Sequence, residues 1–251
     1  MKNLFIALLF TVFLANSVLA FQNNDVKDGH DVLEKMYEMY KDKWYKQLVF
    51  TQKTTFYGAA GEVARTQIWH EAMNLPGNLA IKFDEKDSNN GILFKEGQQY
   101  GFANGILIQQ ADRVHDLLVL GYDVYHQSPE ETGKQLTSNG YDLSKLYMDE
   151  WEGRSVYVVG TAEIDSTKPQ FWVDVERLVF VRNFTIGRQN TIQEVQFNKY
   201  EPLGEGWISP EVVFKANGML GLLEEYSEIA IPDSLNLDIF DPDKFAITSW
   251  E

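Results

Sequence analysis

Histidine and its neighbouring acids are the residues best placed to do chemistry in this sequence. The four histidines are His30, His70, His115 and His126. The stretch "DRVHD" brings Asp112, His115 and Asp116 close together along the chain, a pattern that fits a metal site or an acid–base pair. No pair of histidines has the spacing of a two-histidine metal helix. The alternative interpretation of "DRVHD" is the solvated face of a helix, and we therefore predict no metal ligand.

Other reactive motifs are missing from the sequence. It contains no cysteine, which excludes disulfides, thiolate metal sites and a cysteine nucleophile. It has no Gly-x-Ser-x-Gly nucleophile elbow and no glycine-rich loop for a nucleotide. With 37 acidic residues, any choice of two carboxylates for glycoside hydrolysis would be arbitrary. We predict no catalytic residue and no cofactor; a secreted hydrolase stays an alternative, which would require a buried His–Asp pair in a polar cleft.

The charge balance restricts the possible partners. The formal net charge is −15, and the lysines and arginines form no cluster. Binding to phosphate backbones and to anionic lipid surfaces requires such clusters. We therefore expect no nucleic-acid partner and no tight docking on an anionic membrane surface.

The first twenty residues read as an export signal. Lys2 precedes an apolar run from Leu4 to Leu14, and the small-residue pattern Val18-Leu19-Ala20 predicts cleavage after Ala20. The alternative is a transmembrane anchor, but the run is shorter than the roughly 20 apolar residues of a spanning helix. The sequence thus predicts a signal peptide over 1–20 and a single exported domain over 21–251, which we expect to be monomeric and periplasmic.

The domain reads as mainly β with covering helices. Residues 31–46 show helical spacing, with Asp31 as the expected N-cap and Glu34 answering it in a capping box. From residue 47 the apolar period changes to two, and turns rich in Gly and Asn separate short strands. A helical insertion is predicted over about 111–140, where Ser128 caps and Pro129 opens a helix that stops at Gly140. The pattern gives about eleven strands in an antiparallel meander.

One face of the predicted sheet is unusually rich in phenylalanine. Alternation along the strands places many of these rings on one side, whereas lysine, aspartate and asparagine occupy the other. Such a face is usually a packed core. A cavity is the alternative, because little helical sequence is available to cover about eleven strands, and a strongly curved sheet with few lids leaves a hollow.

The order of these parts resembles the LolA-like family of bacterial periplasmic lipoprotein carriers. The resemblance rests on "LVFTQKTTFY", "TQIWHEAMNLPGNLAIKFD", "LFKEGQQYGF", "PQFWVDVERLVFVRNF" and "VQFNKYEPLGEGWISPEVV", which together run over nearly the whole mature chain. It implies an incomplete antiparallel β-barrel in which the N-terminal helix and the helical insertion form a lid over a hydrophobic cavity. It also implies that the cavity accepts acyl chains of lipoproteins or other lipids and ferries them toward the outer membrane. The implied partners are an inner-membrane releasing complex and an outer-membrane acceptor.

The resemblance and the alternation together nominate site residues. The expected cavity wall comprises Trp44, Phe50, Ile81, Phe83, Phe94, Phe102, Phe171, Val173, Phe180, Phe184, Phe197 and Phe214, and the expected lid comprises Met36, Tyr37 and Tyr40. The family typically places an arginine before the proline of the connection between its second and third strands, whereas this chain has Leu75 before Pro76. Relatives of this architecture also serve as envelope sensors or scaffolds, which is the second hypothesis.

Overall fold

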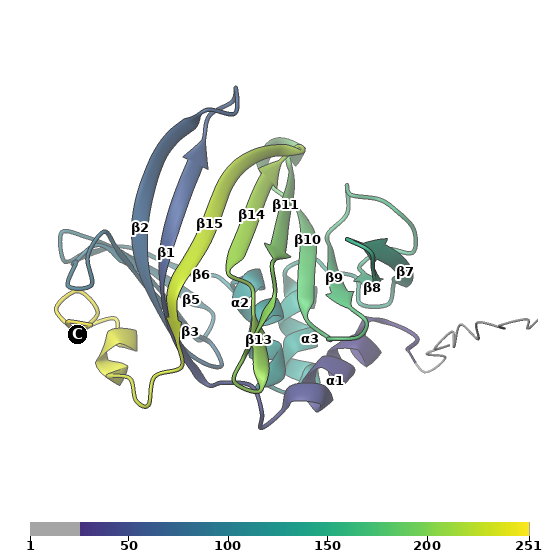
Figure 1. Ribbon diagram of the computed structural model, residues 1–251, viewed down its shortest axis with the longest axis horizontal. Coiled ribbons are helices and arrows are strands. Elements are labelled where there is room, and N and C mark those ends of the chain that lie inside the picture. The colour runs from purple at the N-terminus through teal and green to yellow at the C-terminus, as the bar shows by residue number, and fades with distance from the viewer. Residues whose placement is uncertain (1–25, 251) are drawn as a thin grey trace, which may run out of the picture.

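A thirteen-stranded antiparallel sheet dominates the computed structural model, which describes residues 26–250 (Figure 1). The predicted signal peptide lies outside these described residues. Within them, no helix has both the length and the apolar character needed to cross a membrane. In chain order the strands of the sheet are β1 (Gln47–Tyr57), β2 (Val63–Asn74), β3 (Asn78–Phe83), β4 (Gly91–Lys95), β5 (Gln98–Ala103), β6 (Ile106–Asp112), β7 (Leu146–Trp151), β8 (Arg154–Val159), β9 (Gln170–Asp174), β10 (Phe180–Ile186), β11 (Ile192–Asn198), β14 (Glu211–Ala216) and β15 (Met219–Ala230).

The sheet is curved and does not close into a barrel. Its spatial order is β6-β5-β4-β3-β2-β1-β15-β14-β11-β10-β9-β8-β7, so β6 and β7 are the two edges. Every neighbouring pair is antiparallel, and the pairing of β1 with β15 joins the first six strands to the rest. The strands β12 (Glu201–Leu203) and β13 (Gly206–Ile208) form a separate two-stranded ribbon. The expected fold class, an incomplete antiparallel barrel with covering helices, is confirmed.

The strand number exceeds the expected eleven for two reasons. The long runs at 192–203 and 206–216 each break into two strands, β11 with β12 and β13 with β14. In addition, β6 and β7 are strands where the sequence suggested helix or coil. Both are edge strands, and their alternation is weak because each is hydrogen-bonded to one neighbour and has no buried residue.

The first helix, α1 (Gly29–Tyr40), starts and stops earlier than expected. Asp28, not Asp31, is the N-cap, and its carboxylate accepts hydrogen bonds from the backbone N–H groups of His30 and Asp31. Asp31 takes the third helical position, where its carboxylate accepts from the backbone N–H of Lys27 at 2.7 Å. The helix ends at Tyr40, so Trp44 follows in the turn that leads to β1.

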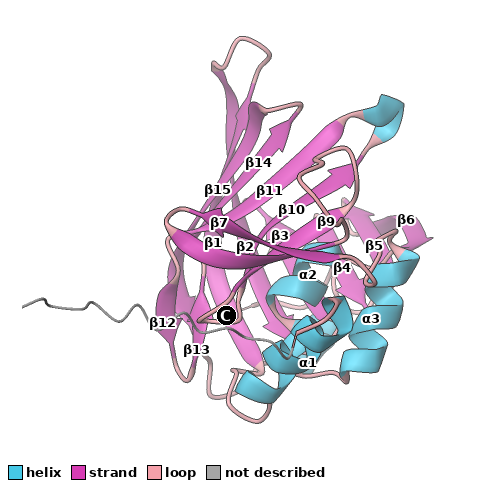
Figure 2. Cartoon of the chain, turned by 90° about the vertical axis from the view of Figure 1, so that its right-hand side faces the viewer, coloured by secondary structure: helices cyan, strands magenta, loops and turns pink. Residues whose placement is uncertain are grey.

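The predicted insertion forms a second helical layer beside α1. It contains α2 (Asp116–Gly121), the short 3₁₀ turn η1 (Asp123–Tyr125) and α3 (Pro129–Ser138). The Ser128 hydroxyl accepts from the backbone N–H of Glu131 at 3.2 Å, as the capping pattern predicted. Gly140, with a φ of +94°, follows directly after the C-cap of α3. All three helices lie against one face of the sheet, here termed the concave face (Figure 2).

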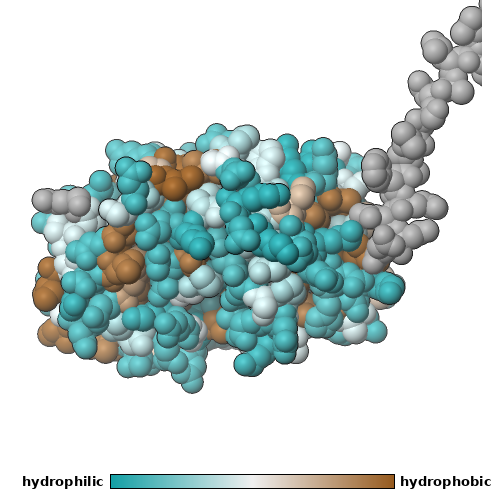
Figure 3. Space-filling view, turned by 90° about the horizontal axis from the view of Figure 1, so that it is seen from below, coloured by the Kyte–Doolittle hydropathy of each residue, from teal (hydrophilic) through white to brown (hydrophobic). Residues whose placement is uncertain are grey.

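The opposite, convex face is covered in part by the C-terminal segment. There the 3₁₀ turn η3 (Leu237–Phe240) and Phe245 pack against strands β2 to β5 in a second apolar cluster. Lys82 of β3 is fully buried beneath this segment, and its ammonium donates to the carbonyl oxygen of Thr248 at 2.6 Å. The C-terminal segment is therefore packed onto the back of the sheet. Seen from below, apolar patches on the surface are separated by hydrophilic side chains (Figure 3).

Candidate functional site

The concave face is divided into a packed part and an open part. Beneath the helices, seven of the predicted wall residues are buried at 7% exposure or less: Phe50, Ile81, Phe94, Phe171, Val173, Phe180 and Phe197. They contact the chain's own side chains; Phe171 packs edge-on against Tyr141, and Phe180 packs edge-on against Phe197. The rings under the helices therefore pack as a core.

Two other predicted wall residues face away from this core. Phe102 lies in the convex cluster, where it stacks on Phe245 with ring centroids 4.6 Å apart. The pairing of β10 with β9 shifts register between Phe180 and Arg182. Because a one-residue shift exchanges the two faces, Phe184 points to the convex side, where the Arg182 guanidinium lies 4.4 Å from its ring centroid. Simple alternation was thus wrong about the face of these two rings.

An open groove remains above the helices. It has a volume of about 690 Å³ and lies between a roof formed by residues 113–117, which lead into α2, and a wall formed by strands β10, β11, β14 and β15. Its lining combines apolar and polar side chains: Arg113, Val114, His115, Leu117, Asn139, Asn183, Thr185, Gln193, Val195, Phe214 and Leu222. The volume falls within the range of small-molecule sites. Of the residues predicted from the sequence, Phe214 lies in its wall.

A row of apolar side chains on adjacent strands, here termed the apolar rung, extends this wall across the sheet. Val195 of β11 pairs with Phe214 of β14, Phe214 with Leu222 of β15, and Leu222 with Phe56 of β1. Further aromatic rings adjoin the end of the rung, because Phe56 contacts Trp69 of β2 at 6.3 Å between centroids and Trp69 contacts Phe83 at 5.1 Å. Of these rings, Phe56, Trp69, Phe83 and Phe214 are half-buried. The open part of the concave face therefore offers accessible apolar surface, to which Phe83 and Phe214 contribute.

A buried acidic pair, Glu71 of β2 and Glu224 of β15, lies on the same face. Glu71 is 6% exposed. Burial, together with the nearby charge of Glu224, raises its pKa well above the ordinary value. Burial also raises the pKa of Glu224 to about 7, although Tyr226 donates a hydrogen bond to it at 3.0 Å. The raised pKa values reduce the negative charge that the two carboxyl groups carry near neutral pH.

The residues of the "DRVHD" stretch have structural roles. The His115 Nδ1 accepts from the backbone N–H of Leu118 at 3.2 Å and thereby caps α2, while burial lowers the pKa of His115 to about 4. Asp116 accepts from Tyr141 at 2.9 Å and from Asn139, which ties α2 to the end of α3. Asp112 bonds to Gln98 instead. Over residues 26–250 no group of three or more His, Asp or Glu side chains could hold a metal ion.

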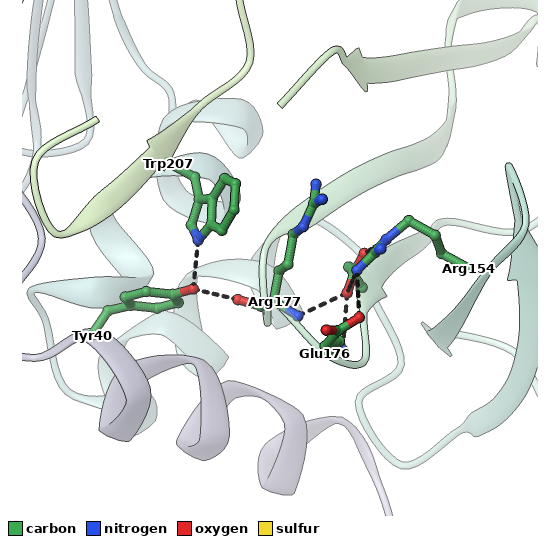
Figure 4. Close-up of polar contacts among 6 residues, drawn as sticks. Tyr40, Arg154, Glu176, Arg177 and Trp207 are labelled. Carbon is green, nitrogen blue, oxygen red and sulfur yellow. Dashed lines mark hydrogen bonds and ion pairs between the residues drawn. The ribbon is translucent and has the colours of Figure 1, made fainter. Parts of the chain in front are cut away.

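The predicted lid helix α1 is fastened to the sheet. The Tyr40 hydroxyl donates to the carbonyl oxygen of Arg177 at 2.6 Å and accepts from Trp207 Nε1 at 3.0 Å (Figure 4). Asp174 fixes the same β9–β10 turn by accepting from the backbone N–H groups of Glu176 and Arg177 and from the Arg154 guanidinium. Trp44 stacks on Tyr125 of η1 with centroids 3.9 Å apart. Met36 is buried and Tyr37 is partly buried, so α1 closes the lower end of the concave face.

The turn between β2 and β3 also helps to close the lower end of the concave face. Leu75, which stands where the family typically has arginine, is buried in the concave core. The next turn residue, Gly77, donates its backbone N–H to the carboxylate of Asp123 in η1 at 2.9 Å. Burial raises the pKa of Asp123 to about 7. The connection therefore serves as a docking point for η1 and places no charge in the groove.

Comparison with known proteins identifies the fold. No protein-family model matches the chain, and no curated protein sequence does. Among solved structures, a DUF1329 family protein from Desulfovibrio piger is similar with a TM-score of 0.59 at 13% identity, over 88% of this chain and 98% of that one. A domain assigned to outer membrane lipoprotein sorting from Vibrio parahaemolyticus gives 0.59 at 13% identity, over 87% and 98%. A LolA superfamily protein from Nitrosomonas europaea gives 0.54 at 13% identity, over 86% and 98%. The chain has a LolA-like fold, as the resemblance predicted.

Proposed function

We propose that this protein, built on a LolA-like fold, is an exported carrier that binds acyl chains of lipoproteins or other lipids. The guest occupies the groove between the roof at residues 113–117 and strands β10, β11, β14 and β15. The carrier would move the lipid through the periplasm toward the outer membrane, between a releasing complex and an acceptor. The observation that carries the proposal is the accessible apolar rung in a groove of about 690 Å³, beside concave rings that are buried as core.

The energetics suit a carrier that must also release its guest. Each buried CH₂ contributes roughly 0.8 kcal/mol, so a dozen methylenes give on the order of 10 kcal/mol. Loss of motional freedom and ordering of side chains subtract several kcal/mol. What remains permits micromolar or tighter binding of one chain without any ionic contact. Because the groove is open along one side and holds polar side chains such as Asn183 and Thr185, part of the guest stays in contact with water.

The likeness to the lipoprotein-sorting domain and to the LolA superfamily protein supports this function. The polar groups of the groove do not favour a hydrolase, since His115 and Asp116 are engaged in capping and tying α2. In the carrier, His115 and Asp116 hold the roof at a fixed distance from the wall of the groove.

The test is uptake of a fluorescent fatty acid by the purified protein and by three single variants. Phe214→Asp and Leu222→Asp place a carboxylate in the apolar rung, and each is expected to weaken binding by at least about tenfold. Met148→Asp is the matched control, because Met148 is exposed on the edge strand β7. Folding of each variant is checked by circular dichroism. Equal uptake by all four proteins would contradict the proposed groove, and mass spectrometry of lipids co-purifying from the native envelope would identify the guest.

A further inference from the structure

The two edges of the sheet differ in how they are protected. Strand β7 carries Asp149 and Glu150, and such charges discourage pairing with other strands. Strand β6 has less protection, because its one charged residue is Asp112 at its end and residues 97–111 include no charged side chain, although the chain carries a net charge of −15. Its residues Ile106, Leu107 and Ile108 are 66%, 45% and 68% exposed. A strand edge that is unpaired, apolar over residues 106–108 and uncharged as far as residue 111 is suited to an added strand.

Strand β6 also leads without a break into the groove. It ends at Asp112, and the following residues 113–117 form the roof. The junction is firmly held, since the backbone N–H of Arg113 donates to the carbonyl oxygen of Gly97 at 2.7 Å and its guanidinium donates to Gln99 at 2.9 Å. A guest that leaves the groove past the roof therefore meets the free edge of β6, which lies at the rim of the sheet (Figure 2).

We propose that β6 binds the extended polypeptide that follows the acylated end of a lipoprotein, by adding it to the sheet as a fourteenth strand. This inference rests on the proposed lipid-binding function of the groove. The acyl chains lie in the groove, and the lipid-linked segment runs along β6, whose backbone N–H and C=O groups on the outer side have no strand partner. Hydrogen bonds between backbones do not depend on the identity of the side chains. One carrier can therefore accept lipoproteins whose N-terminal segments differ in sequence.

The probes are a fluorescent fatty acid, a synthetic diacylated peptide with an uncharged extended tail, and the same lipopeptide with its tail N-methylated at alternate residues. N-methylation removes backbone donors and leaves the lipid unchanged. The wild-type protein is expected to bind the unmethylated lipopeptide about tenfold more tightly than the methylated one, as a few net hydrogen bonds permit. The double variant Ile106→Lys, Ile108→Lys is expected to lose this difference, because lysine on an edge opposes strand addition.

The controls separate this inference from the proposed function. Met148→Lys on the opposite edge, β7, is expected to keep the tenfold preference, and the β6 double variant is expected to bind the fatty acid as the wild type does. If the wild type takes up the fatty acid but binds both lipopeptides equally, the role of β6 is overturned and the groove stands. If the wild type takes up no fatty acid, the proposed function itself fails. If the lipid-free wild type sediments as a dimer that the β6 double variant abolishes, a second copy occupies the edge and the inference is also overturned.

Discussion

The hydroxyl of Tyr40 in α1 donates a 2.6 Å hydrogen bond to the carbonyl oxygen of Arg177, 137 residues later in the β9–β10 turn. The same hydroxyl accepts from the indole of Trp207, so one atom joins the first helix, the β9–β10 turn and the β12–β13 ribbon. This contact keeps the lower end of the concave face closed. It also means that a moving lid would have to break a defined set of bonds at α1, whereas the groove above the helices is already open.

The Tyr40→Phe variant should measure the strength of this fastening. Loss of the hydroxyl removes both bonds and leaves the Arg177 carbonyl and the Trp207 indole N–H without this partner. Unfolding by urea is therefore expected to show a loss of about 1–3 kcal/mol. Tyr37→Phe is the matched control, because the Tyr37 hydroxyl makes no hydrogen bond with any described residue. Equal stability of the two variants would show that the bond does not hold α1.

Replacing Phe171 or Phe214 with alanine should distinguish a core residue from a residue of the groove wall. Phe171 is fully buried, so Phe171→Ala is expected to cost about 3–5 kcal/mol of unfolding free energy. Phe214→Ala should cost clearly less, because its ring is half-buried in the groove wall, yet it should weaken fatty-acid binding more. Urea denaturation and a fluorescence titration of each variant give both quantities. The reverse ranking in both assays would mean that the guest enters beneath the helices.

The buried Glu71–Glu224 pair predicts that its contribution to the free energy of unfolding decreases as the pH rises from 4 to 8. Burial and the charge of Glu224 raise the pKa of Glu71 in the folded state above the ordinary value of 4.5. Its favourable contribution is therefore complete below pH 4.5 and declines as the pH rises through the folded pKa. Glu71→Gln should match the wild type near pH 4 and be more stable at pH 8, as measured by urea midpoints. Glu225→Gln, on the solvent-exposed side of the same strand, should show no such difference.

His115 predicts a dependence of opposite sign. Burial lowers its folded pKa from 6.5 to about 4, so its contribution is complete above pH 6.5 and is lost as the pH falls toward 4. His115→Asn keeps an N-cap acceptor for Leu118 but does not titrate, and its stability relative to the wild type should increase between pH 7 and pH 4.5. His115→Ala should instead lose about 1 kcal/mol already at pH 7. A wild-type His115 resonance titrating near 6.5 by NMR would contradict the buried cap.

Much of this architecture was predictable because local signals and global fold agree. Ser128 followed by Pro129 marks the start of α3, and alternation over residues 47–57 marks β1. The side chains whose position was predicted wrongly share a cause: contacts between distant parts of the chain decide which face of the sheet they occupy. A one-residue register shift turns Phe184 to the convex side, and the path of the C-terminal segment decides that Phe102 is covered.

The groove itself was less predictable than the sheet. Phe171 and Phe214 are the same residue type on strands of the same sheet, and what separates core from wall is where α2 and α3 end above them. Gly140 signals where α3 ends along the chain, but no local signal shows which strands lie beneath that end. The rung from Val195 to Phe56 could have been found from alternation once the strand order was known, because each of its members pairs with the next.

The pairing of β1 with β15 has a geometric consequence. It is the one seam between the N-terminal and C-terminal halves of the thirteen-stranded sheet, and its register is interrupted between Val49 and Thr51. The roof of the groove follows β6 in the first half, whereas the facing wall belongs to the second. A bend of the sheet at the β1–β15 pairing would therefore change the distance between the roof and the wall. The groove could then accept guests of different width without any substitution of its side chains.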